Sequence, residues 1–254
     1  MAYTLNKEEK TTLLTIQGSP YLQEAIRLVE EFVSTQTSVQ EGYQAAFNEI
    51  YTILNKAKSS VDIYLQKRKA KGEIDNISQA LKSIAGNSFS QIIVYIFLKN
   101  KELGIIRSNI FITSQKSKVP SFEEISTIYV DGETQKPDCD LVIYSLTSDL
   151  SLNKCLILSL KTSLRERAGQ TYKWKLLFEI ATTENSIKEK FNISYKSSKM
   201  PLMCFATVNF YEEINNPQQR GMFKFFDKAF IAKNVDADFI AKLSELPTYI
   251  NNVL

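Results

Sequence analysis

A lysine and two aspartates flank a pair of apolar segments in the middle of the chain. Asp140 is the first residue of DLVIYSLT, Asp138 lies two residues before it, and Lys161 lies near the end of KCLILSLKT. If these segments form a β-hairpin, the first residues of one strand meet the last residues of the next. A carboxylate can hold Mg²⁺, and an ammonium beside it can orient water or offset developing phosphate charge. The residues therefore indicate phosphodiester hydrolysis, although a turn aspartate and a solvated lysine would also explain them.

An arginine–glutamate–arginine triplet, Arg165, Glu166 and Arg167, follows soon after the lysine. Arginine can donate to both O6 and N7 of guanine, and a carboxylate can accept from N4 of cytosine. The triplet therefore predicts recognition of G·C pairs in the major groove, although an isolated triplet is also typical of a surface ion-pair cluster. Farther along, Lys173 is a candidate contact to the DNA backbone.

The composition narrows the chemistry that is available. The 254-residue chain contains no histidine, which excludes Ser-His-Asp and Cys-His nucleophile systems and histidine-ligated zinc. Catalysis must then use carboxylates, Lys, Tyr, Ser or Cys, with an oxygen-liganded metal such as Mg²⁺. The net charge is only +3, but basic residues gather near 56–71 and 154–175. Such clusters suit a surface that follows phosphates, and a solvated helix face explains the first cluster equally well.

The first hundred residues predict helices. Apolar residues recur at helical spacing in 21–33 and 42–56, continue through 61–65, and return in 88–101. Asp75 or Asn76 can cap a helix in the second half of this region. We expect residues 1–85 to form a helical region for dimerisation or DNA clamping, and residues 86–254 to form the catalytic and DNA-recognition core. One compact unit fits the pattern as well as two domains.

Beyond residue 104 the pattern favours β-structure. Strands are expected within 105–113, 140–147, 154–162 and 202–209, with an edge strand within 223–232. Helices are expected over 168–183 and 236–246, the second one stopped by Pro247. Nearly continuous apolar runs suit central strands covered on both faces. The predicted fold class is α/β, a mixed sheet flanked by helices and preceded by a helical region.

The order of these features resembles the PD-(D/E)XK nuclease superfamily. The run SLKTSLRER resembles type II restriction endonucleases with a K-[ST]-S-x-R-[DE]-R signature, including cutters of CCGG-containing sites and, in similar form, GATC cutters. Upstream, GNSFSQII resembles the Gly-x-x-Phe-[EQ]-[EQ] helix of these enzymes, and downstream FATVN followed by FKFFD is similar to relatives. The resemblance covers about residues 86–232 and is most specific over 161–167.

This resemblance implies a set of site residues. Asp140 matches the metal-binding aspartate, because aliphatic residues follow it directly, and Lys161 matches the catalytic lysine. Ser159 stands where the superfamily usually has Glu or Asp, and some restriction enzymes with this serine take the carboxylate from the following helix. Gln91 stands where relatives have a metal-bridging glutamate. The implied Mg²⁺ ligands are Asp140, Glu179 and, in reserve, Asp138, and the implied DNA contacts are Ser163, Arg165, Glu166, Arg167 and Lys173.

The interpretation that joins these residues is a Mg²⁺-dependent type II site-specific deoxyribonuclease. A two-fold symmetric protein cuts both strands of a two-fold symmetric site most simply. The expected partner is therefore double-stranded DNA with a short palindromic site, and the expected assembly is a homodimer or a tetramer. Two alternatives stay open: a structure-selective repair or junction-resolving nuclease of the same superfamily, and a non-catalytic DNA-binding module, which Ser159 would favour.

The cellular location is predicted from cysteines and apolar runs. Three scattered cysteines form no CxxC pair and are typical of reduced residues in the cytoplasm. The longest apolar run, 92–98, is far shorter than the ~20 residues that a membrane helix needs. We expect a cytoplasmic, prokaryotic-type enzyme without a membrane partner.

Overall fold

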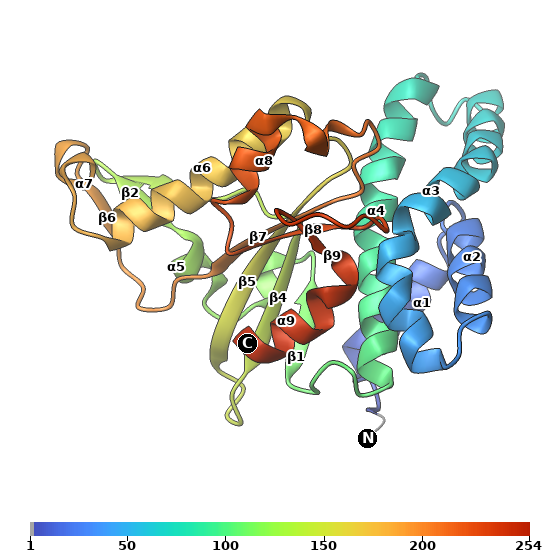
Figure 1. Cartoon of the computed structure of the whole chain (residues 1–254), viewed down its shortest axis with the longest axis horizontal. Helices are drawn as coiled ribbons and strands as arrows, with labels where there is room; N and C mark the ends of the chain where they lie inside the picture. The colour runs from blue at the N-terminus through green and yellow to red at the C-terminus, as the bar shows by residue number, and fades with distance from the viewer. Residues whose placement is uncertain (1–2) are drawn as a thin grey trace.

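The computed structural model describes residues 3–254, and for residues 165–170 it describes the backbone alone. A group of N-terminal helices lies at one side of a six-stranded mixed sheet, and a three-stranded sheet lies at the other (Figure 1). The predicted α/β class, with helices flanking a mixed sheet and a helical N-terminal region, is confirmed.

The helical region comprises four elements: α1 (Lys7–Gln17), α2 (Gln23–Ser34), α3 (Val39–Ala70) and α4 (Ile77–Glu102). Side-chain caps set where the long helices begin, because Ser38 accepts from the backbone of Glu41 and Asn76 accepts from that of Gln79. Of the two caps considered for α4, the structure thus has Asn76. Helices α2 and α3 approach closely at Gly42, where a Cβ would lie 2.9 Å from Cγ1 of Val33.

Helix α4 is the central helix of the structure. The whole apolar run Ile92–Leu98 lies within it and is buried. By length and composition α4 also qualifies as a candidate membrane span. It packs, however, against α3 and β5 and is buried on every side over this run, as the core helix of a soluble protein is.

The six-stranded sheet has the order β1 (Ile110–Thr113), β4 (Leu141–Leu146), β5 (Leu152–Lys161), β7 (Leu202–Thr207), β8 (Lys228–Ile231) and β9 (Ala241–Lys242). The pairs β1–β4 and β4–β5 are antiparallel, whereas β5–β7, β7–β8 and β8–β9 are parallel. A second sheet has the order β3 (Glu133–Gln135), β2 (Ile128–Val130) and β6 (Ile193–Tyr195).

Both faces of the central strands are covered. On one face, Leu156 and Leu158 of β5 belong to the same apolar cluster as the buried residues of α4. On the other face, Ile157 packs in a cluster with Phe178 of α6 (Arg165–Thr182). The expectation of central strands buried on both faces is confirmed.

Two local predictions were wrong. The strand within 223–232 is β8, which pairs with both β7 and β9 and is therefore interior, so that the short β9 forms the edge. Pro247 lies in the first turn of α9 (Leu246–Val253) and does not stop a helix, because proline lacks only an N–H that the first turn leaves unpaired in any case. Residues 236–246 instead contain β9 and the 3₁₀ turn η3 (Leu243–Glu245).

Shorter elements connect these layers: η1 (Lys116–Lys118), α5 (Phe122–Ser126), α7 (Ser186–Lys190), η2 (Glu213–Asn215) and α8 (Pro217–Phe223). Helix α4 runs unbroken through residues 85 and 86, where the sequence suggests a division. One apolar cluster also contains residues from Leu5 to Leu254. The division into a helical region and a core therefore stays a prediction about function.

Candidate active site

The β4–β5 hairpin brings Asp140 and Lys161 together. Leu141 pairs with Leu158, so Asp140 lies just beyond the paired end of β4, while Lys161 is the last residue of β5. Nζ of Lys161 lies 3.1 Å from Oδ2 of Asp140. The same oxygen accepts a hydrogen bond of 2.7 Å from the backbone N–H of Leu160. The predicted meeting of this aspartate and lysine is confirmed.

The two aspartates are held differently. Asp138 lies 3.8 Å from Nζ of Lys161 and its side chain is 78% exposed, whereas the side chain of Asp140 is 33% exposed. Between them, burial raises the pKa of the Cys139 thiol to about 12. A protonated thiol is a poor nucleophile and a poor metal ligand. Carboxylates are therefore the anionic groups that this end of the hairpin offers.

The pair lines a cleft of about 1600 Å³. Small-molecule pockets typically measure roughly 300–1,000 Å³, so this cleft suits a larger substrate. Its lining residues come from the N-terminal part of α4, the second half of α3, helix α8, the end of β5 and the segment after β7, elements that can be followed in Figure 1. The lining includes Lys58 of α3, Lys82, Asn87 and Gln91 of α4, Asp138, Asp140, Lys161 and Ser163 of the hairpin end, and Tyr211, Gln218 and Gln219.

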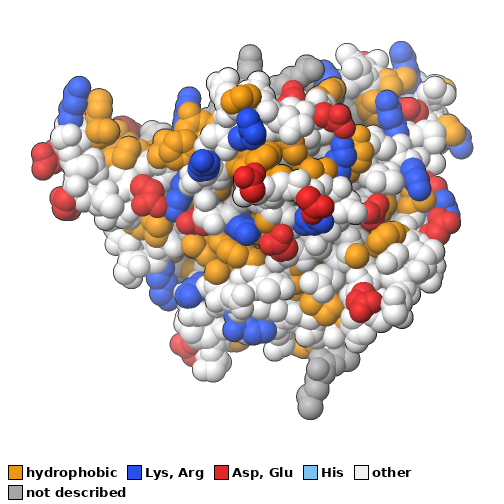
Figure 2. Space-filling view, in the orientation of Figure 1, with side chains coloured by type: hydrophobic (Ala, Val, Ile, Leu, Met, Phe, Trp, Pro, Cys, Tyr) orange, Lys and Arg blue, Asp and Glu red, His pale blue; other side chains and the backbone are white. Residues whose placement is uncertain are grey.

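One face of the molecule carries mixed charge. On the face shown in Figure 2, basic and acidic side chains are interspersed and do not gather into one basic field. The net charge of the chain is only +3, so its general electrostatic attraction for DNA is weak. The cleft itself contains the basic side chains of Lys58, Lys82 and Lys161.

The DNA-contact residues expected from the sequence fall in three places. Ser163 lines the cleft, and its hydroxyl donates to Oε2 of Glu213 at 3.3 Å. Lys173 is exposed on α6 and is not among the residues that line the cleft. The side chains of Arg165, Glu166 and Arg167 lie outside the described residues, and their backbone forms the first turn of α6.

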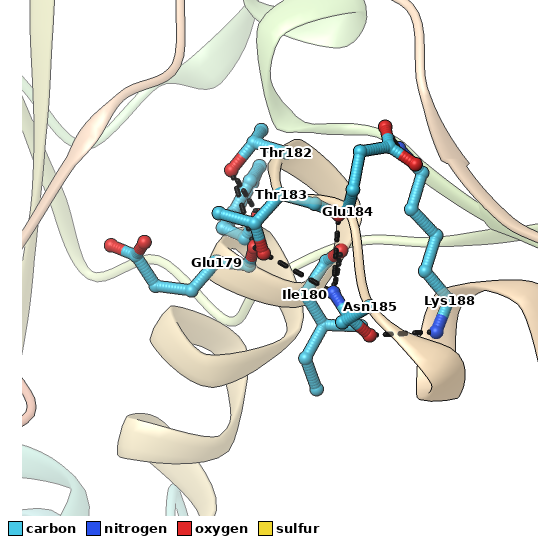
Figure 3. A network of polar contacts seen from close by, with 8 residues as sticks. Glu179, Ile180, Thr182, Thr183, Glu184, Asn185 and Lys188 are labelled. Atoms are coloured by element: carbon cyan, nitrogen blue, oxygen red, sulfur yellow. Dashed lines mark hydrogen bonds and ion pairs between the residues drawn. The ribbon is translucent and has the colours of Figure 1, made fainter.

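The structure does not bring Glu179 to the hairpin end. Its carboxylate pairs with Nζ of Lys175 at 2.6 Å, and Lys175 also contacts Oδ1 of Asp227 at 2.8 Å. Asp227 in turn accepts from the backbone N–H of Met203, near the start of β7, whereas Lys161 is level with Thr207 at the end of that strand. In Figure 3 the Glu179 carboxylate points away from the network of Thr182, Thr183 and Asn185 at the end of α6.

Glu179 therefore belongs to a structural ion-pair cluster. Burial lowers the pKa of Lys175, but its bonds to Asp227 and Glu179 outweigh burial and leave that pKa raised. The assignment of Glu179 as a partner of Asp140 in one metal site is not supported by this placement. Among the described residues, no group of three or more Cys, Asp or Glu side chains is close enough together to hold a metal.

Two further positions named from the sequence lie at or beneath the site. Ser159 is 1% exposed, and its hydroxyl has no hydrogen-bond partner among the described residues. It lies two residues before Lys161, at the position where the PD-(D/E)XK pattern that the sequence resembles has an acidic residue. Gln91 lines the cleft and donates to the hydroxyl of Tyr21 at 3.1 Å.

The sequence analysis missed several residues that line the cleft, namely Lys82, Asn87, Tyr211, Gln218 and Gln219, and also missed Glu213, which accepts the backbone N–H of Leu164 beside it. Most of them lie in α4 or in the segment after β7, far along the chain from the hairpin. No spacing in the sequence relates these segments to the hairpin, because only the packing of α4 and β7 beside β5 brings them together. The signal that the sequence offered was the group of polar residues in the N-terminal half of the otherwise apolar helix α4, which could have indicated residues that line a site.

A mixed sheet whose central hairpin ends in an aspartate–lysine pair, open to a cleft of this size, is consistent with the restriction endonuclease fold. The model of the BsaWI restriction endonuclease type 2 family matches residues 112–249, more than half of the chain. The chain belongs to this family, and it is a type II site-specific deoxyribonuclease. No curated protein matches it. The matched part spans the sheet from β1 to α9 and leaves α1 to α4 outside.

Proposed function

We propose that this restriction enzyme hydrolyses both strands of a short palindromic DNA site with Mg²⁺ and that Asp140 and Lys161 form its cleavage centre. The observation that carries the proposal is the 3.1 Å contact between Nζ of Lys161 and Oδ2 of Asp140 at the edge of the cleft. An acidic and a basic group in one place can bind both a cation and a phosphate.

The donor set fits Mg²⁺. This ion prefers oxygen ligands and is often held by one or two carboxylates together with substrate phosphates and water. Both described hydrogen bonds of Asp140 use Oδ2, so Oδ1 stays available, and Asp138 offers a second carboxylate nearby. Mg²⁺ held there would polarise a phosphate oxygen and lower the pKa of a water molecule.

Lys161 and the basic residues of the cleft act on the phosphates. The Lys161 side chain is 14% exposed, so its charge is poorly screened and can offset the charge that develops on the scissile phosphate. Lys58 of α3 and Lys82 of α4 also line the cleft, and we assign them to phosphate contacts outside the cleavage centre. We propose on this basis that the N-terminal helices clamp DNA, and that Lys173 adds an outer backbone contact.

Sequence recognition is assigned to the start of α6. Arg165 and Arg167 would donate to guanine edges, Glu166 would accept from cytosine N4, and Ser163 would contact the backbone. A homodimer would present this set to each half of a palindrome. The enzyme is proposed to act in the cytoplasm of a prokaryotic-type cell, as a dimer or a pair of dimers.

Digestion of plasmid DNA with Mg²⁺ tests the proposal. Fixed bands, with a single sequence at all ends, are expected from a site-specific enzyme, and chelation of the metal should remove them. Cleavage without fixed bands would support a structure-selective nuclease, and Mg²⁺-independent binding without cleavage would support a non-catalytic module. Light scattering of the protein with the cut-site duplex distinguishes monomer, dimer and tetramer.

Competition between specific and random duplex tests base recognition. Arg165→Ala or Arg167→Ala should weaken specific binding by ~1–3 kcal/mol for each guanine that is left without its arginine donors, in both half-sites. Binding to random duplex should fall only by the salt-dependent share of one charge per subunit. Equal losses on both duplexes would show that the arginines bind only phosphate.

A further inference from the structure

The three-residue link between β5 and α6 is tied to the segment that follows β7. The backbone N–H of Phe210 donates to the carbonyl of Thr162 at 3.1 Å. The Ser163 hydroxyl and the Leu164 N–H donate to the same oxygen, Oε2 of Glu213, at 3.3 and 2.7 Å. Every residue between Lys161 and the first residue of α6 is therefore bonded to residues 210–213.

Glu213 supplies what the start of α6 lacks. The N-cap residue of this helix is Leu164, which has no side chain that could accept a hydrogen bond. The first N–H groups of a helix have no partner within it, so they need an acceptor from outside the helix. The Glu213 carboxylate lies at that end and accepts the Leu164 N–H.

The Glu213 carboxylate is itself held in place. The backbone N–H of Glu213 donates to Oδ1 of Asn209 at 2.8 Å, and the backbone N–H of Asn209 donates to Oγ1 of Thr207 at 2.9 Å. Asn209 is 2% exposed and has a φ of 49°, a left-handed conformation that asparagine tolerates better than most residues. Thr207 is paired in register with Lys161 across β5 and β7. The carboxylate thus has a defined position relative to the catalytic lysine.

We propose that Glu213 is a positioning residue for DNA recognition, which fixes the first turn of α6, and with it residues 165–167, relative to the cleavage centre. The inference rests on the proposed role of that turn in reading the site. It predicts that Glu213 controls the discrimination between cognate and random DNA and leaves the metal-dependent chemical step intact.

The test compares Glu213→Ala, Glu213→Gln and the control Glu212→Gln. Glutamine keeps an oxygen that can accept from Leu164, whereas alanine does not, and both remove the same charge. Glu212 is the adjacent carboxylate, 70% exposed and paired with Lys233 at 2.8 Å, so it reports any general effect of charge on this segment. Thermal melting of each variant checks that the fold is intact.

Two measurements are made on each protein. Amide hydrogen exchange of the free protein reports the order of the first turn of α6, residues 164–168. Competition binding without metal reports the ratio of affinities for the duplex that contains the mapped cut site and for random duplex. We expect Glu213→Ala to speed exchange and to lower the ratio by roughly tenfold, as loss of one bond to a charged group would. Glu213→Gln should recover most of both, and Glu212→Gln should change neither.

Unchanged exchange in Glu213→Ala would overturn the proposal, and so would equal losses of affinity on both duplexes. A Glu213→Gln variant as impaired as the alanine variant would also overturn it, because charge and not the accepted hydrogen bond would then matter. Failure of the proposed site recognition has a different signature. The wild-type protein would show no preference among duplexes, while exchange would still show whether Glu213 orders α6.

Discussion

Among the described residues, the pairs Asp140–Lys161 and Asp227–Lys175 are similar in construction and lie in different places. In the first, Oδ2 of Asp140 accepts the backbone N–H of Leu160 at 2.7 Å and contacts Lys161. In the second, Oδ2 of Asp227 accepts the backbone N–H of Met203 at 2.7 Å, and Oδ1 contacts Lys175. Each aspartate thus contacts a lysine side chain and also accepts a hydrogen bond from the backbone of a central strand.

The two pairs differ in whether the aspartate keeps a carboxylate oxygen that makes none of the described hydrogen bonds. Asp140 uses Oδ2 for both of its described bonds and keeps Oδ1 available, whereas Asp227 uses both oxygens. The side chain of Lys175 is 9% exposed and has a second partner in Glu179, so its charge is fully paired. An aspartate–lysine pair that keeps a carboxylate oxygen available is thus suited to chemistry. A pair of the same residue types in which both oxygens are used is suited to stability.

The largest expected effect comes from the first pair. Lys161→Met and Asp140→Asn should each reduce cleavage by at least roughly 10²–10³-fold, since each removes a charge that acts on the reacting phosphate. Specific binding should stay close to that of the wild-type protein, because neither residue is assigned to the bases. Single-turnover cleavage and competition binding measure the two effects. Normal cleavage by Asp140→Asn would remove this residue from the site.

The same substitution in the second pair should act on stability. Lys175→Met leaves a poorly exposed Asp227 without its partner and should lower the free energy of unfolding by roughly 3 kcal/mol. Lys175 has a raised pKa, so its contribution is complete at neutral pH and is lost only as pH rises through that value. Urea unfolding measures the loss, with the exposed Lys173→Met as control. Cleavage per folded molecule should be unchanged, and a stable but inactive variant would contradict the comparison.

Asp138→Asn should have an intermediate effect. Its carboxylate is 78% exposed and lies 3.8 Å from Nζ of Lys161, so it is less firmly placed than Asp140. We expect a higher Mg²⁺ requirement and a smaller loss of rate than in Asp140→Asn. A metal titration of cleavage for both variants makes the comparison. The reverse order of severity would mean that Asp138 is the principal ligand.

The smallest effect is expected for Glu179→Gln. Its side chain is 46% exposed, and Lys175 keeps its contact with Asp227. The free energy of unfolding should change by no more than about 1 kcal/mol, and the metal titration of cleavage should match that of the wild-type protein. A shifted titration would mean that Glu179 contributes to metal binding, and the Lys175 cluster would then not be purely structural.

The meeting of Asp140 and Lys161 could be predicted because it depends on local strand pairing. Two apolar segments separated by a short polar stretch form an antiparallel hairpin, and antiparallel pairing brings the first residues of one strand to the last of the next. The helical region and the buried central strands were predictable for a similar reason, since helical spacing and continuous apolar runs are properties of neighbouring residues.

The place of Glu179 could not be predicted in this way. Helix α6 begins after the hairpin end and runs back along β5, so Glu179 lies about 20 Å along its axis from the first turn at a rise of ~1.5 Å per residue. Its distance from Lys161 thus depends on how the helix packs on the sheet. Spacing along the chain contains no information on that packing.

The sequence by itself determined the α/β class, the strands that form the hairpin and the aspartate and lysine at its end, because periodicity and antiparallel pairing act over short stretches. Only the tertiary structure decided that α4 and the segment after β7 line the same cleft, that Glu213 lies at the start of α6, and that Glu179 joins Asp227. These contacts join residues far apart in the chain, and they form only when helices and strands pack against a common core.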